Sequence, residues 1–157
     1  MGEFLPYDVK GRNSEVIMLT EKIDKELIEI LKKFFSDRQE IMFAWLFGSY
    51  ANGHNNCYSD IDIAVYIRDN ILLDDVDWYL GLKADIMELV NKEVDLVLLN
   101  NAKPMIKHVA NMQKIILLSR DELFEAEYSL RVIKEYNDVR YWARFSRQSL
   151  LGGIKNG

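Results

Sequence analysis

Residues 48–62 read GSYANGHNNCYSDID, with ten residues between a Gly-Ser pair and an Asp-x-Asp pair. The preceding run, residues 41–47, is continuously apolar and ends at Gly48, so it predicts a short buried strand. Residues 60–66 have an alternating pattern that predicts a second strand, with Ile61, Ile63 and Val65 on one face. Asp60 and Asp62 then point to the other face. The Gly-Ser pair therefore lies in a turn between two strands, close to a pair of carboxylates.

Each part of this motif suits a chemical task. Gly48 lacks a side chain where backbone would approach a phosphate, and Ser49 adds a hydroxyl beside the amides of the turn. The turn is a candidate site for a nucleoside triphosphate. Asp60 and Asp62 are like charges held close together, which is unfavourable unless a cation or proton lies between them. We therefore expect Mg²⁺ at this pair.

A third carboxylate, Asp95, lies within an otherwise apolar run over residues 93–99 that predicts another strand. An unpaired charge in such a run is costly, which indicates a local partner or a shared metal. If this strand lies beside the second strand, Asp60, Asp62 and Asp95 converge. Three carboxylates facing a triphosphate suit a two-metal arrangement. A solvent-facing aspartate on an edge strand is the alternative for Asp95.

The remaining pattern predicts an α/β (α+β) fold with a single mixed β-sheet backed by helices. Helical spacing of apolar residues predicts helices over residues 20–35 and 75–91, and Pro104 suits the first turn of a short helix. Residues 114–118 predict a last short strand. A final helix is expected over 120–147, with Ser119 and Glu122 spaced as a capping box.

One domain is expected, because about 150 residues can bury roughly two-thirds of their unfolded surface. It spans residues 19–150. Residues 1–18 lack helical periodicity and are expected to be a flexible tail or a non-native extension, and residues 151–157 a second flexible tail.

Composition excludes several classes of protein. The net charge of −5 argues against direct nucleic-acid binding, which needs clustered Lys and Arg. Cys57 is the only cysteine, so no intramolecular disulfide can form, and a reducing cytoplasm is expected. The longest apolar run, residues 41–47, is far shorter than the ~20 residues that cross a bilayer. We expect no membrane association.

The combination of Gly48-Ser49, ten intervening residues, Asp60-Ile61-Asp62 and the later Asp95 resembles the DNA polymerase β-type nucleotidyltransferase superfamily. The small size resembles its minimal branch, the MNT domain. The resemblance implies that Gly48 and Ser49 hold the triphosphate and that Asp60 and Asp62 bind metal, and that Asp95 binds the catalytic metal and helps to deprotonate the acceptor. Asn52 stands where many relatives carry an Arg, so a phosphate contact is expected to be missing.

Many proteins of this branch and size are similar to antitoxins of HEPN/MNT toxin-antitoxin systems. This likeness implies transfer of AMP from ATP, with Mg²⁺ (two ions), to a tyrosine hydroxyl of a HEPN-type RNase toxin. Two alternatives stay open: nucleotidylation of a small hydroxyl compound such as an aminoglycoside, and a non-catalytic antitoxin that acts by binding.

The final helix carries more aromatic and arginine residues than one buried stripe needs. These are Tyr128, Tyr136, Tyr141, Trp142, Phe145, Arg131, Arg140, Arg144 and Arg147. Because Arg, Trp and Tyr are favoured in protein interfaces, the surplus favours docking of a protein partner or of a second copy as a homo-oligomer. His54 and His108 are interpreted as an exposed loop residue and a residue on a solvated helix face.

Overall fold

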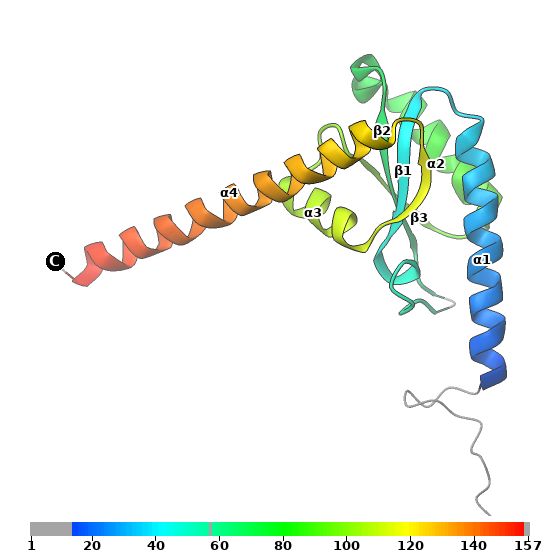
Figure 1. The fold of residues 1–157 in the computed structure, drawn as a ribbon, viewed down its shortest axis with the longest axis horizontal. Coiled ribbons are helices and arrows are strands. Elements are labelled where there is room, and N and C mark those ends of the chain that lie inside the picture. Colours follow the sequence, from blue (N-terminus) through cyan, green and yellow to red (C-terminus); the bar gives the residue numbers. More distant parts are fainter. Residues whose placement is uncertain (1–13, 57, 156–157) are drawn as a thin grey trace, which may run out of the picture.

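The fold is a four-stranded mixed sheet with helices on both faces (Figure 1). A computed structural model describes residues 14–56 and 58–155. The strands are β1 (Ile41–Phe47), β2 (Ile61–Ile67), β3 (Val94–Leu98) and β4 (Ile115–Ser119), in the order β3-β2-β1-β4. β1 pairs antiparallel with β2 and β4, and β2 pairs parallel with β3. The expected single mixed sheet is confirmed.

The helices are α1 (Ser14–Ser36), α2 (Val76–Val90), α3 (Pro104–Gln113) and α4 (Glu122–Lys155). Two short 3₁₀ turns, η1 (Gly48–Tyr50) and η2 (Asn70–Asp74), follow β1 and β2. Pro104 occupies the first turn of α3, as expected, because proline has no amide hydrogen to lose there. In residues 14–56 and 58–155, no helix is both long and apolar enough to cross a membrane.

Two apolar clusters lie on opposite faces of the sheet, because successive strand residues point to opposite sides. One cluster joins Leu46 of β1 to Phe35 of α1 and Ile86 of α2. The other joins Trp45 of β1 to Tyr128 and other residues of α3 and α4. The continuous apolar run of β1 is thus explained by burial on both faces.

Arg120 connects the end of β4 to the turn between α1 and β1 through hydrogen bonds. Its guanidinium donates to the carbonyl oxygens of Ile41 (2.8 Å), Ser36 (3.0 Å) and Arg38 (3.1 Å). These carbonyls include groups that the end of a helix leaves without an intrahelical partner. One side chain therefore fixes three elements at the corner of the sheet.

Both ends of the described chain are more helical than the sequence pattern predicts. Residues 14–18, expected in a flexible tail, form the first turns of α1, while residues 1–13 lie outside the described part. Val16 and Met18 are exposed there, so neither belongs to a buried stripe that the sequence pattern could reveal. At the other end α4 continues past residue 147 to Lys155, through part of the second expected tail.

The predicted capping box at Ser119 and Glu122 is wrong. Ser119 still belongs to β4 and pairs with Phe43, so it is not available to cap a helix. Asp121 takes that place, because its carboxylate accepts from the amide of Phe124 at 3.0 Å.

Candidate functional site

The Gly-Ser turn begins where β1 ends, and it lies against Asp62. Gly48 has φ of +72°, a conformation that L side chains rarely adopt. A Cβ atom built on Gly48 would overlap Oδ2 of Asp62 and lie 2.9 Å from its Cγ. Glycine is therefore required here for backbone conformation and for close approach of a carboxylate. Ser49 follows, half-buried, in the same turn.

Asp62 and Asp95 are direct neighbours across the parallel pair of β2 and β3. Alternation along β2 puts Asp62 on the face that α3 and α4 cover, away from the buried Ile61 and Ile63. Burial raises the pKa of Asp62 above its ordinary value, and the charges of Asp95 and Asp60 raise it further. Asp60 precedes β2 and is exposed, as is Asp95.

The pair formed by Asp62 and Asp95 suits a divalent cation. Carboxylate oxygens are the ligands that Mg²⁺ prefers, and repulsion between the acids favours a cation beside them. As the side chains stand in residues 14–56 and 58–155, no three acidic, imidazole or thiol groups form a metal cluster. The roles assigned to Asp60, Asp62 and Asp95 stay a prediction.

Gln113, the last residue of α3, forms a hydrogen bond with the Gly-Ser turn. Its side-chain oxygen Oε1 accepts from the backbone N–H of Gly48 at 3.1 Å. The amide of Gly48 is therefore engaged within the protein. We infer that the hydroxyl of Ser49, rather than the Gly48 amide, is the group offered to a phosphate.

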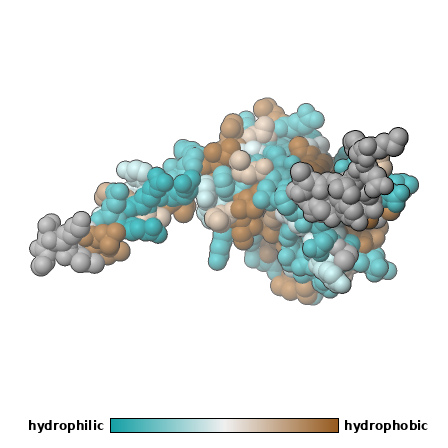
Figure 2. Space-filling view, turned by 90° about the horizontal axis from the view of Figure 1, so that it is seen from below, coloured by the Kyte–Doolittle hydropathy of each residue, from teal (hydrophilic) through white to brown (hydrophobic). Residues whose placement is uncertain are grey.

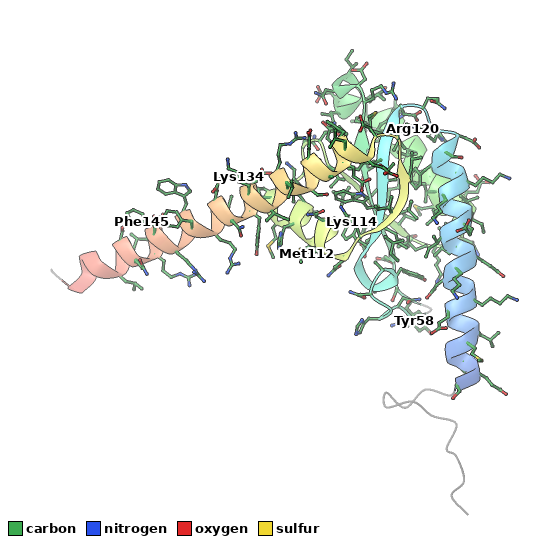
Figure 3. The ribbon with its side chains drawn as sticks, viewed as in Figure 1. Tyr58, Met112, Lys114, Arg120, Lys134 and Phe145 are labelled. Carbon is green, nitrogen blue, oxygen red and sulfur yellow. The ribbon has the colours of Figure 1, made fainter. Side chains whose placement is uncertain are left out.

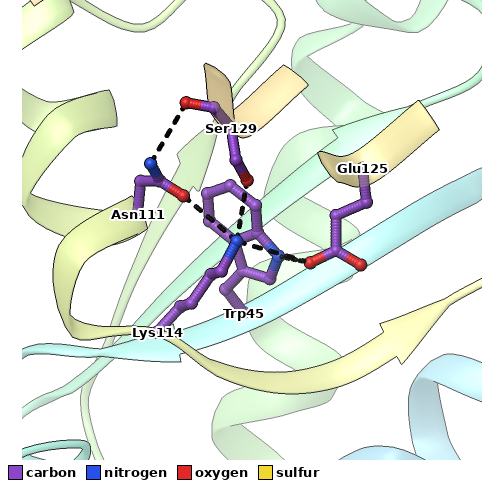
Figure 4. Close-up of polar contacts among 5 residues, drawn as sticks. All are labelled: Trp45, Asn111, Lys114, Glu125 and Ser129. Carbon is purple, nitrogen blue, oxygen red and sulfur yellow. Dashed lines mark hydrogen bonds and ion pairs between the residues drawn. The ribbon is translucent and has the colours of Figure 1, made fainter. Parts of the chain in front are cut away.

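A polar cluster packed between α3, α4 and β1 lies at the end of α3, where Asn111 and Lys114 flank Gln113 in the sequence (Figure 4). Lys114 donates to Ser129 Oγ at 2.7 Å and to Asn111 Oδ1 at 3.1 Å, and its ammonium lies 4.4 Å from the Trp45 ring centre. The Trp45 indole N–H donates to Glu125 Oε1 at 2.7 Å. Burial lowers the pKa of Lys114, while Glu125, 3.8 Å away, opposes that shift.

Asn55 anchors the loop between the Gly-Ser pair and Asp60. This buried side chain donates through Nδ2 to Asp24 of α1 at 3.2 Å. Farther along, Ser59 Oγ accepts from the Asn56 amide at 2.9 Å. Burial raises the pKa of Asp24, and the bond from Asn55 partly offsets that rise. The loop is therefore tied to α1 on one side of the site.

Two other polar residues of the motif region contact each other. Asn52 and His54 are exposed, and His54 bonds to the Asn52 carbonyl through Nδ1 at 2.9 Å. His108 was expected on a solvated helix face. It is instead half-buried and stacks on Tyr136, with ring centres 3.8 Å apart.

Sequence reasoning missed Gln113, Asn55 and Glu125. The one available signal was Trp45, since a buried indole N–H needs an acceptor. Nothing in the local pattern identifies which residue, 80 positions away, supplies it.

Residues 29–123 match the family model described as "Polymerase beta, Nucleotidyltransferase". The chain belongs to this nucleotidyltransferase family. A curated relative from Methanocaldococcus jannaschii, named "Putative protein adenylyltransferase", is 34% identical over 90 residues, which cover 57% of this chain and 88% of that protein.

Solved structures of toxin-antitoxin complexes share the fold. One, described as a toxin-antitoxin with AMP-PNP, has a TM-score of 0.59 at 24% identity, covering 84% of this chain and 98% of that chain. Another contains a tri-AMPylated Shewanella oneidensis HEPN toxin with its MNT antitoxin, with a TM-score of 0.55 at 21% identity and coverage of 87% and 98%. The polymerase β-like fold expected from the motif is confirmed.

Proposed function

We propose that this chain transfers AMP from ATP to a tyrosine hydroxyl of a HEPN-type toxin and so acts as its antitoxin. The observation that carries the proposal is the contact of Asp62 with the Gly48 backbone, together with its pairing to Asp95. This arrangement puts a candidate phosphate-binding turn and two carboxylates into one site. The relative named as an adenylyltransferase and the fold neighbours in toxin-antitoxin complexes support the same activity.

The reaction forms one bond and breaks one bond. The tyrosine oxygen attacks the α-phosphorus of ATP, and the bond from that phosphorus to the α–β bridging oxygen breaks, releasing pyrophosphate. Asp95 accepts the hydroxyl proton, and Ser49 orients the triphosphate. Asp60, Asp62 and Asp95 would hold Mg²⁺, which when bound neutralises charge on the phosphates.

The test combines purified chain, ATP, Mg²⁺ and the cognate HEPN protein, followed by intact-mass spectrometry of that protein. We expect a mass increase of one or more adenylyl units, and an unchanged mass would refute the proposal. Chelation by EDTA should abolish transfer, and excess Mg²⁺ should restore it, because the carboxylates alone cannot neutralise the phosphates.

Substitution of the carboxylates separates an enzyme from an antitoxin that acts by binding. Asp62→Asn should lower transfer by at least ~100-fold, since metal ligands rarely tolerate loss of charge. The matched control is Asp77→Asn, an exposed carboxylate on α2. If the Asp60→Asn/Asp62→Asn double variant still protects cells from the toxin, the chain acts by binding and the catalytic proposal is wrong.

A further inference from the structure

The outer part of α4 extends away from the rest of the molecule (Figures 1 and 2). The inner part packs on the sheet through Tyr128 and Val132, which are buried. Farther out, Glu135 forms an ion pair with Lys107 at 3.3 Å, and Tyr136 stacks on His108. From residue 137 to residue 153 every side chain is exposed. We call residues 137–153 the arm.

The arm presents an aromatic face that no part of the described chain covers. Tyr141, Trp142 and Phe145 are 65%, 63% and 53% exposed, and Figure 3 labels Phe145 on this projecting segment. The ring centres of Tyr141 and Trp142 lie 5.9 Å apart, and those of Trp142 and Phe145 lie 6.2 Å apart. Aromatic residues exposed together in this way mark interaction sites.

An arginine stripe runs beside the aromatic face. Arg140, Arg144 and Arg147 are spaced at i, i+4 and i+7, so they lie on one side of the helix. Asp138 is the one acidic residue of the arm, although the whole chain has a net charge of −5. Positive charge is therefore concentrated on the arm, beside the residues that most often dominate protein interfaces.

The arm needs a partner for its own stability. Helices of about 12–15 residues are marginal in water, because most helical stability in proteins comes from packing of one face. The arm lacks that packing, and two glycines, Gly152 and Gly153, weaken its outer end. A partner that covers the aromatic face would supply the missing stabilisation.

Charge selects among the possible partners. A second copy that packs arm against arm would bring two arginine stripes together, and such like-charge contacts are costly. Three arginines on an acidic chain neutralise too few phosphates for firm binding to RNA. A protein with an acidic helical face matches both features, because carboxylates can pair with the guanidinium groups while apolar side chains meet the aromatic rings.

We propose that the arm docks the acceptor protein through an acidic, partly apolar helical face of that protein. The inference rests on the proposed function, because it assigns where the HEPN-type acceptor binds. Docking on the arm would hold the acceptor through a surface separate from Asp62 and Asp95, so the two tasks can be altered independently.

The test reverses the arginine stripe with Arg140→Glu/Arg144→Glu/Arg147→Glu. The matched control, Lys22→Glu/Lys25→Glu/Lys33→Glu, makes the same change of charge on exposed positions of α1. Binding of the cognate HEPN protein is measured by calorimetry, and AMP transfer is measured at varied HEPN and ATP concentrations. We expect the arm variant to raise Kd and KM for the HEPN protein by at least ~10-fold, a change of 1.4 kcal/mol. Its KM for ATP should match that of the wild type, and the control should change neither.

A second variant, Tyr141→Ala/Trp142→Ala/Phe145→Ala, keeps the charge and should weaken HEPN binding as strongly. Equal HEPN affinity in wild type and both arm variants would overturn the inference, as would an equal loss in the α1 control. A wild-type dimer that the arm variants dissociate, or arm-dependent binding of a single-stranded RNA 20-mer, would reassign the surface. If the wild type binds the HEPN protein through the arm but transfers no AMP, the proposed function fails while the docking surface stands.

Discussion

Gly48 is under two separate constraints at the residue scale. Its φ of +72° disfavours any side chain, and the carboxylate of Asp62 occupies the space that a Cβ would need. Gly53 has the same φ, but nothing lies within 4 Å of where its Cβ would stand. The two glycines therefore allow backbone strain to be separated from displacement of the carboxylate.

Gly48→Ala should lower kcat/KM for AMP transfer by at least ~100-fold, because displacement of a reacting group by about 1 Å can cost that much. Gly53→Ala should lower the free energy of unfolding by roughly 1–2 kcal/mol and reduce transfer far less. Transfer kinetics and urea denaturation of both variants provide the measurement. Equal losses of transfer would show that strain, and not the position of Asp62, limits activity.

Tyr128 links stability to pH through a buried hydroxyl. It donates to the carbonyl oxygen of Leu99 at 2.8 Å, and burial raises the pKa of its phenol above the ordinary value of 10.0. Above about pH 10 the unfolded chain loses this proton while the folded chain keeps it. The contribution of Tyr128 to stability is therefore complete below pH 10 and declines as pH rises further.

Tyr128→Phe should cost about 1–2 kcal/mol at pH 7, because the Leu99 carbonyl loses its partner. Its stability should then fall less steeply than that of the wild type between pH 9.5 and pH 11. Thermal unfolding across this range checks both effects, and parallel slopes would show that the Tyr128 phenol does not titrate differently on folding.

At the scale of elements, the end of α3 connects the body of the fold to the site. Asn111 and Lys114 are bonded to Ser129 of α4, and Gln113 between them accepts from the Gly48 amide. The turn that carries Ser49 is thus supported by a helix end that is itself fixed by another helix.

Gln113→Met should lower kcat/KM for AMP transfer by roughly 10-fold, because the Gly48 amide loses its acceptor and the turn is less firmly held. Its neighbour Met112 is 65% exposed, so Met112→Gln is a matched control that should behave as wild type. Gln113→Glu keeps an acceptor and should retain the turn while weakening ATP binding by charge repulsion. Unchanged kinetics in Gln113→Met would show that the turn holds without this bond.

For the whole molecule, the body and the arm are expected to be energetically independent. Among the described residues, none beyond Val132 belongs to the core clusters, and all side chains from 137 to 153 are exposed. A chain that ends at Asn137 should therefore unfold within about 2 °C of the full chain, while its affinity for the HEPN protein falls. Calorimetric unfolding compares the two chains, and a large fall in Tm would show that the arm also stabilises the body.

Much of the fold follows from local pattern. The apolar run of β1, the alternation in β2 and the helical spacing in α2 each reflect burial that repeats at a fixed period. Prediction fails where a helix has no periodic burial, or where a residue's role depends on a distant partner. Residues 14–18 and 148–155 are helical, and their described side chains are exposed. Ser119 has the spacing of a helix cap, but it belongs to β4 and pairs with Phe43.

The sequence by itself determined the chemistry available to this protein: a glycine-serine pair, spaced aspartates and the strands that carry them. Only the tertiary structure decided that Asp62 stands beside Asp95 and against Gly48, and that Gln113 holds the turn. The physical reason is the sequence separation over which each kind of interaction acts. Periodicity and turn chemistry act between residues a few positions apart, whereas strand order and the partner of a buried polar group depend on how distant segments pack.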